Sequence, residues 1–129
     1  MDDRLDSQHS TRVVHTTPNV QTELDDVVAV LERTLGENLQ QIMLYGSQAR
    51  GDARFDSDVD LLVVVAMGTP AADDVVHRVT YDVMASHDFD ALISALVVDE
   101  AGYEKLLAGG FSFARNLDRD KVVLWSKAA

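Results

Sequence analysis

Cysteine is absent from the 129 residues, which excludes both a disulfide framework and a thiolate metal site. The four histidines, at positions 9, 15, 77 and 87, are scattered, and no two have the spacing of zinc ligands. Long hydrophobic runs are also missing, because the longest covers only residues 61–67 and is far too short to cross a bilayer. The first ten residues carry acids where a signal peptide would carry bases. We therefore expect a soluble, cytoplasmic protein without a membrane segment.

Basic residues are scarce. The chain has 11 Lys and Arg against 22 Asp and Glu, for a net charge of −11, and the acids are 17 Asp and only 5 Glu. This bias indicates adaptation to a very salty, halophilic cytoplasm. Such a surface repels nucleic acid at ordinary ionic strength, and no basic patch is present to bind it. Nucleic acid is therefore not expected as a direct substrate, although in molar salt a Debye length of about 3 Å weakens the repulsion.

The hydrophobic pattern predicts alternating helices and strands. Residues 22–35, 71–87 and 99–107 carry apolar side chains at helical spacing. Short apolar segments at 41–45, 59–66, 89–98 and 121–125 predict strands, and the second of these is apolar on both faces, as a central strand is. We expect an α/β or α+β fold, in which helices pack on a small mixed sheet.

The length of the chain is that of one domain. Residues 1–20 show no hydrophobic period, and we expect them to form a flexible N-terminal tail. Residues 21–127 then form the single domain, which leaves no room for a second, substrate-binding one.

Two aspartates, Asp58 and Asp60, stand at the start of the predicted central strand. An Asp-x-Asp pair alone says little, because this chain has four of them, at 56/58, 58/60, 88/90 and 118/120. In a strand, however, residues i and i+2 point to the same side, so these two carboxylates lie about 7 Å apart. They repel each other and lose hydration unless they share a cation. Magnesium is the expected cation, since it takes a few carboxylate oxygens and completes its shell with water and phosphate.

Gly46 and Ser47 follow the strand predicted at 41–45. A glycine lets a phosphate approach the backbone closely, while the Ser47 hydroxyl and the N–H groups at a helix start donate hydrogen bonds to an anion. The alternative is a tight turn in which Ser47 only caps the following helix.

Together these segments resemble the motif of the polymerase-β-type nucleotidyltransferases, and of the minimal nucleotidyltransferases in particular. The sequence has Gly-Ser, ten intervening residues and Asp-x-Asp, with Ala-Arg-Gly inside the interval. The resemblance implies that family's fold. It also implies that Gly46 and Ser47 bind the β and γ phosphates of ATP, and that Asp58 and Asp60 are catalytic and hold two Mg²⁺ ions.

The resemblance suggests roles for two further residues but leaves alternatives open for each. Arg50 either contacts a phosphate or braces its loop against Asp52 or Asp56. The family also has a third carboxylate, a metal ligand and general base, on the strand after the connecting helix, and Asp90 is the candidate here. A different register would place Leu92 or Ser94 at that position, and neither could replace a carboxylate.

The family's chemistry implies transfer of AMP from ATP to a hydroxyl, with release of pyrophosphate. Larger relatives carry an added domain that binds the acceptor, so for this chain we expect a protein partner or a homodimer. Minimal nucleotidyltransferases resemble the antitoxins that inactivate an all-helical HEPN-type toxin, and an antitoxin-like role is the first hypothesis. The alternatives are a catalytically degenerate antitoxin that only binds its partner, and a stand-alone enzyme that modifies a small molecule such as an aminoglycoside.

Overall fold

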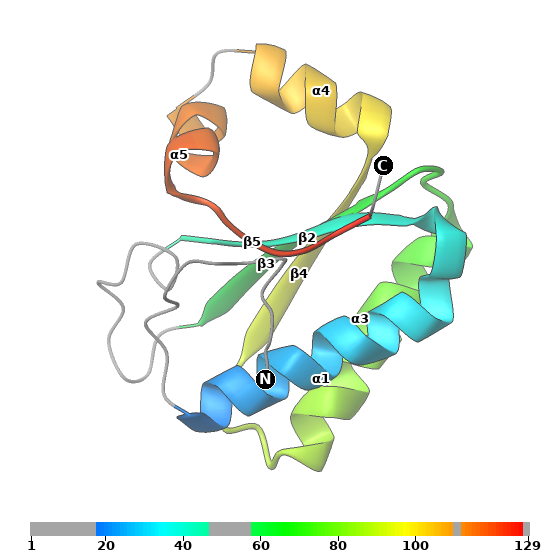
Figure 1. The fold of residues 1–129 in the computed structure, drawn as a ribbon, viewed down its shortest axis with the longest axis vertical. Helices are drawn as coiled ribbons and strands as arrows, with labels where there is room; N and C mark the ends of the chain where they lie inside the picture. The colour runs from blue at the N-terminus through cyan, green and yellow to red at the C-terminus, as the bar shows by residue number, and fades with distance from the viewer. Residues whose placement is uncertain (1–17, 47–57, 110–111, 128–129) are drawn as a thin grey trace.

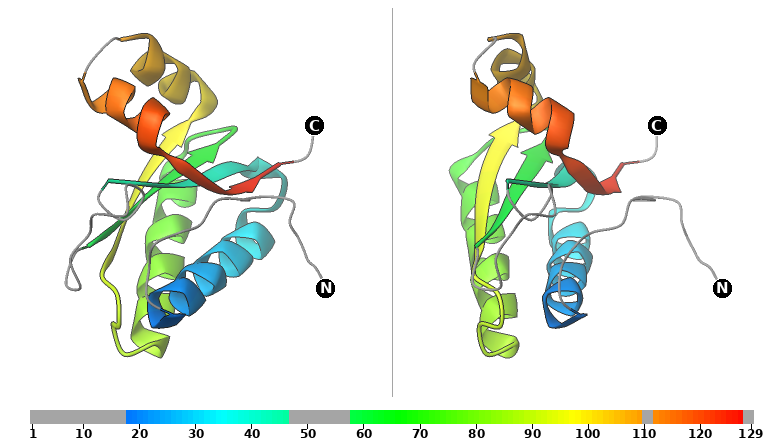
Figure 2. Two further views of the ribbon diagram at one scale, coloured as in Figure 1. Left: turned by 60° about the vertical axis from the view of Figure 1, so that its left-hand side comes forward. Right: turned by 90° about the vertical axis from the view of Figure 1, so that its left-hand side faces the viewer.

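A computed structural model describes residues 18–46, 58–109 and 112–127. Within these residues the chain forms a four-stranded sheet in the order β4-β3-β2-β5, in which β3 and β4 are parallel and the other pairs antiparallel. Helices α1 and α3 cover one face and α4 and α5 the other (Figures 1 and 2). The elements, in chain order, are α1 (Pro18–Leu35), the 3-10 helix η1 (Gly36–Asn38), β2 (Leu39–Tyr45), β3 (Val59–Val65), α3 (Pro70–Ser86), β4 (Ile93–Asp99), α4 (Glu100–Ala108), α5 (Ser112–Asp120) and β5 (Val122–Ser126). The predicted mixed sheet with packed helices is confirmed.

Strand β3 is central because its side chains are apolar on both faces. Val59, Leu61 and Val63 belong to the larger core cluster, together with side chains of α1 and α3. Leu62 and Val64 point the other way, into a smaller cluster with Leu117 of α5. A strand covered on both faces needs this near-continuous apolar sequence, and burial of each such side chain contributes about 2 kcal/mol. The prediction of a central strand here is confirmed.

Local signals start the two helices that flank β4. The hydroxyl of Thr69 accepts a hydrogen bond from the Ala72 N–H at 3.0 Å, and Pro70 occupies the first turn of α3. Asp99 caps α4 in the same way, because its Oδ1 accepts from the Gly102 N–H at 2.7 Å. These caps fix the points at which the chain leaves the sheet after β3 and after β4.

Two boundaries lie four residues from the positions predicted from the sequence, more than the others do. Helix α1 begins at Pro18 and not at Thr22, so residues 18–20 are helical and do not belong to a tail. Strand β4 begins at Ile93 and not at Phe89, because Asp88 and Phe89 have left-handed φ values of 55° and 57° and belong to a turn. In the described part of the chain, no helix has the length and apolarity needed to span a membrane.

Candidate functional site

The site begins where β2 ends. Tyr45, the last residue of β2, pairs with Asp60 of the antiparallel strand β3, and Gly46 then turns the chain with a φ of +78°. A Cβ on Gly46 would lie 2.6 Å from Oδ2 of Asp60, closer than real Cβ atoms come to other atoms. Two features therefore favour glycine here: the left-handed backbone, and the Asp60 carboxylate that a Cβ would have to displace.

The two aspartates lie at the start of β3, as the sequence predicts. Asp58 is exposed just before the strand, and Asp60 is half-buried as its second residue. Alternation along β3 places Asp60 on the sheet face opposite to that of Val59, which packs with α1 and α3. Burial, and in second place the charge of Asp58, raise the pKa of Asp60 above its ordinary value. Asp60 therefore carries a charge that water and the protein compensate poorly.

Tyr45 responds to the same charge. Burial raises the pKa of its hydroxyl, and the negative charge of Asp60 adds to the effect. The hydroxyl beside the carboxylate thus stays protonated. A divalent cation fits this site, because it would neutralise the Asp58 and Asp60 carboxylates, and the missing Cβ of Gly46 leaves the Asp60 carboxylate open to the backbone turn.

Asp90 lies before β4, outside the strand residues that pair with β3. Strands β3 and β4 are parallel, and the β4 residue in register with Asp60 is Ser94. One step earlier, the Val59 N–H donates to the Leu92 carbonyl oxygen at 2.8 Å. Asp90 is exposed in the turn before β4, four residues ahead of Ser94. Among the described residues, no group of three or more His, Asp or Glu side chains is arranged to hold a metal.

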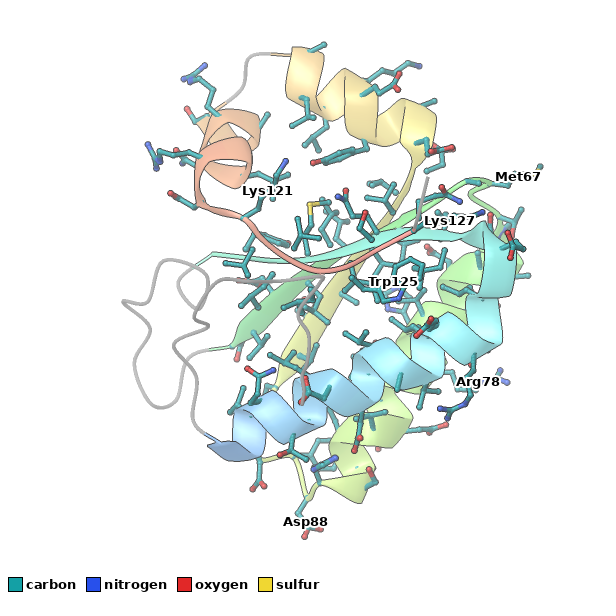
Figure 3. All side chains as sticks on the ribbon, in the orientation of Figure 1. Met67, Arg78, Asp88, Lys121, Trp125 and Lys127 are labelled. Carbon is teal, nitrogen blue, oxygen red and sulfur yellow. The ribbon has the colours of Figure 1, made fainter. Side chains whose placement is uncertain are left out.

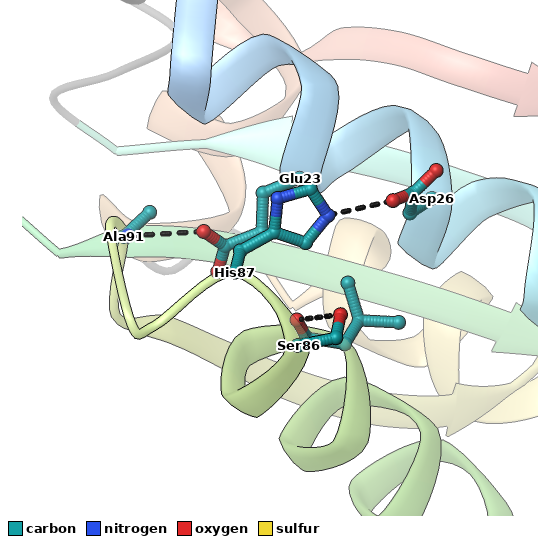
Figure 4. A network of polar contacts seen from close by, with 6 residues as sticks. Glu23, Asp26, Ser86, His87 and Ala91 are labelled. Atoms are coloured by element: carbon teal, nitrogen blue, oxygen red, sulfur yellow. Dashed lines mark hydrogen bonds and ion pairs between the residues drawn. The ribbon is translucent and has the colours of Figure 1, made fainter.

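Long-range contacts hold that turn in place (Figure 4). The Glu23 Oε1 of α1 accepts a hydrogen bond from the Ala91 N–H at 3.1 Å, and His87 Nε2 lies 2.6 Å from Asp26 Oδ2. Figure 3 places Asp88 at the tip of the turn, at the end of α3. Contacts of residues 87–91 therefore hold the turn between α3 and β4 against α1. Strand β4 begins only after this turn, at Ile93. Sequence reasoning missed Glu23, which is completely buried although its type favours the surface.

Ser47 and Arg50 lie outside the described residues, as do all residues from 47 to 57. Their predicted contacts with phosphate, and the alternative contact of Arg50 with Asp52 or Asp56, stay predictions. The described part of the site thus consists of Gly46, Asp58 and Asp60.

Known sequences match this region. The family model described as "Polymerase beta, Nucleotidyltransferase" matches residues 26–94, just over half of the chain. An aminoglycoside (3'') (9) adenylyltransferase of Klebsiella pneumoniae is 46% identical over 48 residues, which are 37% of this chain and 18% of that protein. This chain thus spans less than a fifth of the length of that relative. A protein of Methanocaldococcus jannaschii, provisionally named a protein adenylyltransferase, is 29% identical over 107 residues, 83% of this chain and 99% of that protein.

Solved structures share the fold. One chain of a toxin–antitoxin crystal structure with AMP-PNP has a TM-score of 0.50 at 21% identity, covering 80% of this chain and 73% of its own. A toxin–antitoxin crystal structure of an MntA–HpeT mutant gives a TM-score of 0.52 at 19% identity, covering 81% of this chain and 73% of its own. Likeness at this level of identity shows the fold, and it agrees with the fold predicted from the sequence motif.

Proposed function

Since the chain belongs to the polymerase beta nucleotidyltransferase family, we propose that it transfers AMP from ATP to a hydroxyl group of a partner protein, in an antitoxin-like role. The observation that carries the proposal is the Asp58 and Asp60 pair at the start of β3, with the backbone of Gly46 against the Asp60 carboxylate. A half-buried carboxylate and an exposed one that repel each other next to a glycine turn suit a metal-bound triphosphate.

In the proposed reaction, Asp58 and Asp60 hold Mg²⁺, while Gly46 and Ser47 donate hydrogen bonds to the β and γ phosphates. Arg50 binds a phosphate or braces the loop. Magnesium, when bound, neutralises the triphosphate and helps to position its α-phosphorus. The acceptor oxygen forms a bond to that phosphorus, the bond to the bridging oxygen breaks, and pyrophosphate leaves. The acceptor proton passes to solvent or to a base. Ser94, and not Asp90, pairs with Asp60 in the sheet, so the proposal does not depend on Asp90.

The choice of a protein acceptor has one main support. The M. jannaschii relative is provisionally named a protein adenylyltransferase. The match covers 99% of its length, so the likeness extends over that protein as a whole. The aminoglycoside enzyme is matched over only 18%, and this supports a shared nucleotide site more than a shared acceptor. The toxin–antitoxin structures share the fold, and a helical HEPN-type toxin is accordingly the first partner to test.

The first experiment is calorimetric titration of ATP with Mg²⁺, in high salt, into wild type and Asp58→Asn. Binding that saturates in wild type and disappears in the variant supports the proposed site. Asp74→Asn is the matched control. Asp74 is an exposed aspartate on α3, so this substitution removes the same charge at a different place. Absence of binding by the wild type would reject the nucleotide site.

The second experiment measures transfer of labelled AMP to a candidate toxin, with the same variants. Asp58→Asn should abolish the transfer and Asp74→Asn should not. A degenerate antitoxin is the second candidate. It is favoured because Ser94, which is not a carboxylate, occupies the position beside Asp60 at which a third carboxylate would lie. It is supported instead if an Asp58→Asn, Asp60→Asn double variant still neutralises the toxin fully.

A further inference from the structure

Two large apolar side chains are exposed next to the proposed site. Leu92 and Leu96 are 55% and 40% exposed, and Ser94 between them is exposed as well. Their neighbour Ile93 packs into the core with α3, so alternation places these three side chains on the opposite face of the sheet, which is also the face of Asp60. Ser94 lies in register with Asp60. We call Leu92, Ser94 and Leu96 the β4 strip.

The β4 strip lies at an edge of the sheet. In the part of the chain that the structure describes, β4 pairs with β3 alone. The carbonyl of Leu92 points toward β3, where it accepts from the Val59 N–H, while the N–H of Ile93 points away and donates to the sulfur of Met84 at 3.2 Å. By the same alternation, the N–H groups of Ala95 and Val97 face the open edge. An exposed edge with apolar side chains is a place where another chain can add a strand.

The charges of the chain segment that carries the β4 strip restrict what can bind there. No Lys or Arg occurs between Arg78 and Lys105, and Asp58 and Asp60 lie on the neighbouring strand. The acids in the same interval are Asp82, Asp88, Asp90, Asp99, Glu100 and Glu104. A second copy of this chain would bring acid against acid, and a nucleic acid would add phosphate to it. A protein segment that combines apolar and basic side chains is complementary in both respects.

We propose that the β4 strip binds the acceptor segment of the partner protein, as an extended strand that carries Lys or Arg and adds to the edge of β4. This inference rests on the proposed function. Neighbouring strands lie about 4.8 Å apart, so a hydroxyl residue opposite Ser94 would be two strands, or about 10 Å, from Asp60. With the β and γ phosphates toward Gly46, the α-phosphorus of a triphosphate held by Mg²⁺ at Asp60 would lie between Asp60 and this hydroxyl. Leu92 and Leu96 would contact apolar residues on either side of the hydroxyl residue.

The test uses two labelled heptapeptides. In the first, leucine, serine and leucine alternate with four lysines, which puts the apolar residues and the hydroxyl on one face of a strand. In the second, glutamate replaces every lysine. Fluorescence anisotropy measures their binding to wild type, to a Leu92→Thr, Leu96→Thr double variant and to Met67→Thr. Met67 is the control, because it is 69% exposed and follows the end of β3, whereas Leu92 contacts the start of that strand.

We expect the lysine peptide to bind wild type and Met67→Thr alike, and to bind the double variant at least about tenfold more weakly. Threonine keeps the strand propensity of β4, so the double variant should fold normally, as circular dichroism can check. The glutamate peptide should not bind. Equal binding of the lysine peptide to wild type and double variant, or equal binding of both peptides, would overturn the proposal.

Two further measurements separate this inference from the proposed function. Asp58→Asn should still bind the lysine peptide, and the double variant should still bind ATP with Mg²⁺ as wild type does. Intact nucleotide binding without peptide binding would reject the β4 strip alone. Absent nucleotide binding in wild type would reject the proposed function itself.

Discussion

Gly46 and Asp60 lie so close together that a Cβ on Gly46 would come within 2.6 Å of the Asp60 carboxylate. Gly36 offers a comparison, because it also has a left-handed φ, of +56°, but a Cβ there would meet nothing within 4 Å. The two glycines therefore separate the cost of backbone conformation from the cost of contact with the carboxylate.

Gly46→Ala should destabilise the protein more than Gly36→Ala does. Both variants place alanine in the left-handed region, which costs about 1 kcal/mol. Gly46→Ala must in addition displace Asp60, and we expect a total loss of about 2–3 kcal/mol in the free energy of unfolding. Urea denaturation in high salt measures both losses. Equal losses would show that the contact with Asp60 is relieved without strain.

Replacing Asp58 should change the titration of Asp60. Burial is the larger cause of the raised pKa of Asp60 and the charge of Asp58 the smaller. In Asp58→Asn the pKa of Asp60 should therefore fall, yet stay above its ordinary value. Carbon NMR of the side-chain carboxyl, recorded without magnesium, measures the shift directly. An unchanged pKa, or the same change in Asp74→Asn, would contradict the proposed coupling of the two carboxylates.

Asp90 provides a separate test of the metal site. Since Ser94 and not Asp90 lies in register with Asp60, we expect Asp90→Asn to bind ATP and Mg²⁺ within about twofold of wild type. Asp60→Asn should lose the binding, because it removes a carboxylate of the proposed pair. Calorimetry under identical salt conditions compares the two variants. A large loss in Asp90→Asn would restore Asp90 as the third ligand predicted from the family resemblance.

The sequence predicted elements whose cause is local. The Leu- and Val-rich run after Asp60 is a buried central strand, and the Thr69–Pro70 signal starts α3 close to where it was expected. The start of β4 was not predictable in this way, because the turn before it depends on Glu23 and Asp26, which are 68 and 61 residues away from their partners. The position of β5 beside β2 likewise has no local signal.

The same reasoning explains which part of the site could be predicted. Asp58 and Asp60 lie at the start of a single strand, so their positions relative to each other follow from the sequence motif alone. The residue beside Asp60 in β4 depends on the register between two strands, and that register depends on where the turn ends. A carboxylate only four residues from Ser94 is therefore a reasonable candidate from sequence, although the structure places it elsewhere.

Glu23 is the buried group that supports this turn. One carboxylate oxygen accepts from the Ala91 N–H, and the other, Oε2, is buried and has no hydrogen-bond partner among the described residues. Burial is the first cause that raises the pKa of Glu23 above its ordinary value, and Asp90 adds to it, whereas the Ala91 hydrogen bond and His87 act in the opposite direction. A raised carboxyl pKa stabilises the fold below the unfolded-state pKa, and this contribution is lost as the pH rises through the folded-state pKa.

Glu23→Gln should therefore make the protein more stable relative to wild type at pH 7 than at pH 4. Glutamine has nearly the same shape and keeps an acceptor for the Ala91 N–H, but it cannot ionise. Urea denaturation at constant salt measures this difference in the free energy of unfolding between the two pH values. Glu32→Gln is the matched control, since Glu32 is an exposed residue of the same helix and its replacement should change little. A pH-independent effect of Glu23→Gln would mean that Glu23 ionises in the folded protein as easily as in the unfolded chain. A group that stabilises the charge of Oε2 would then be required.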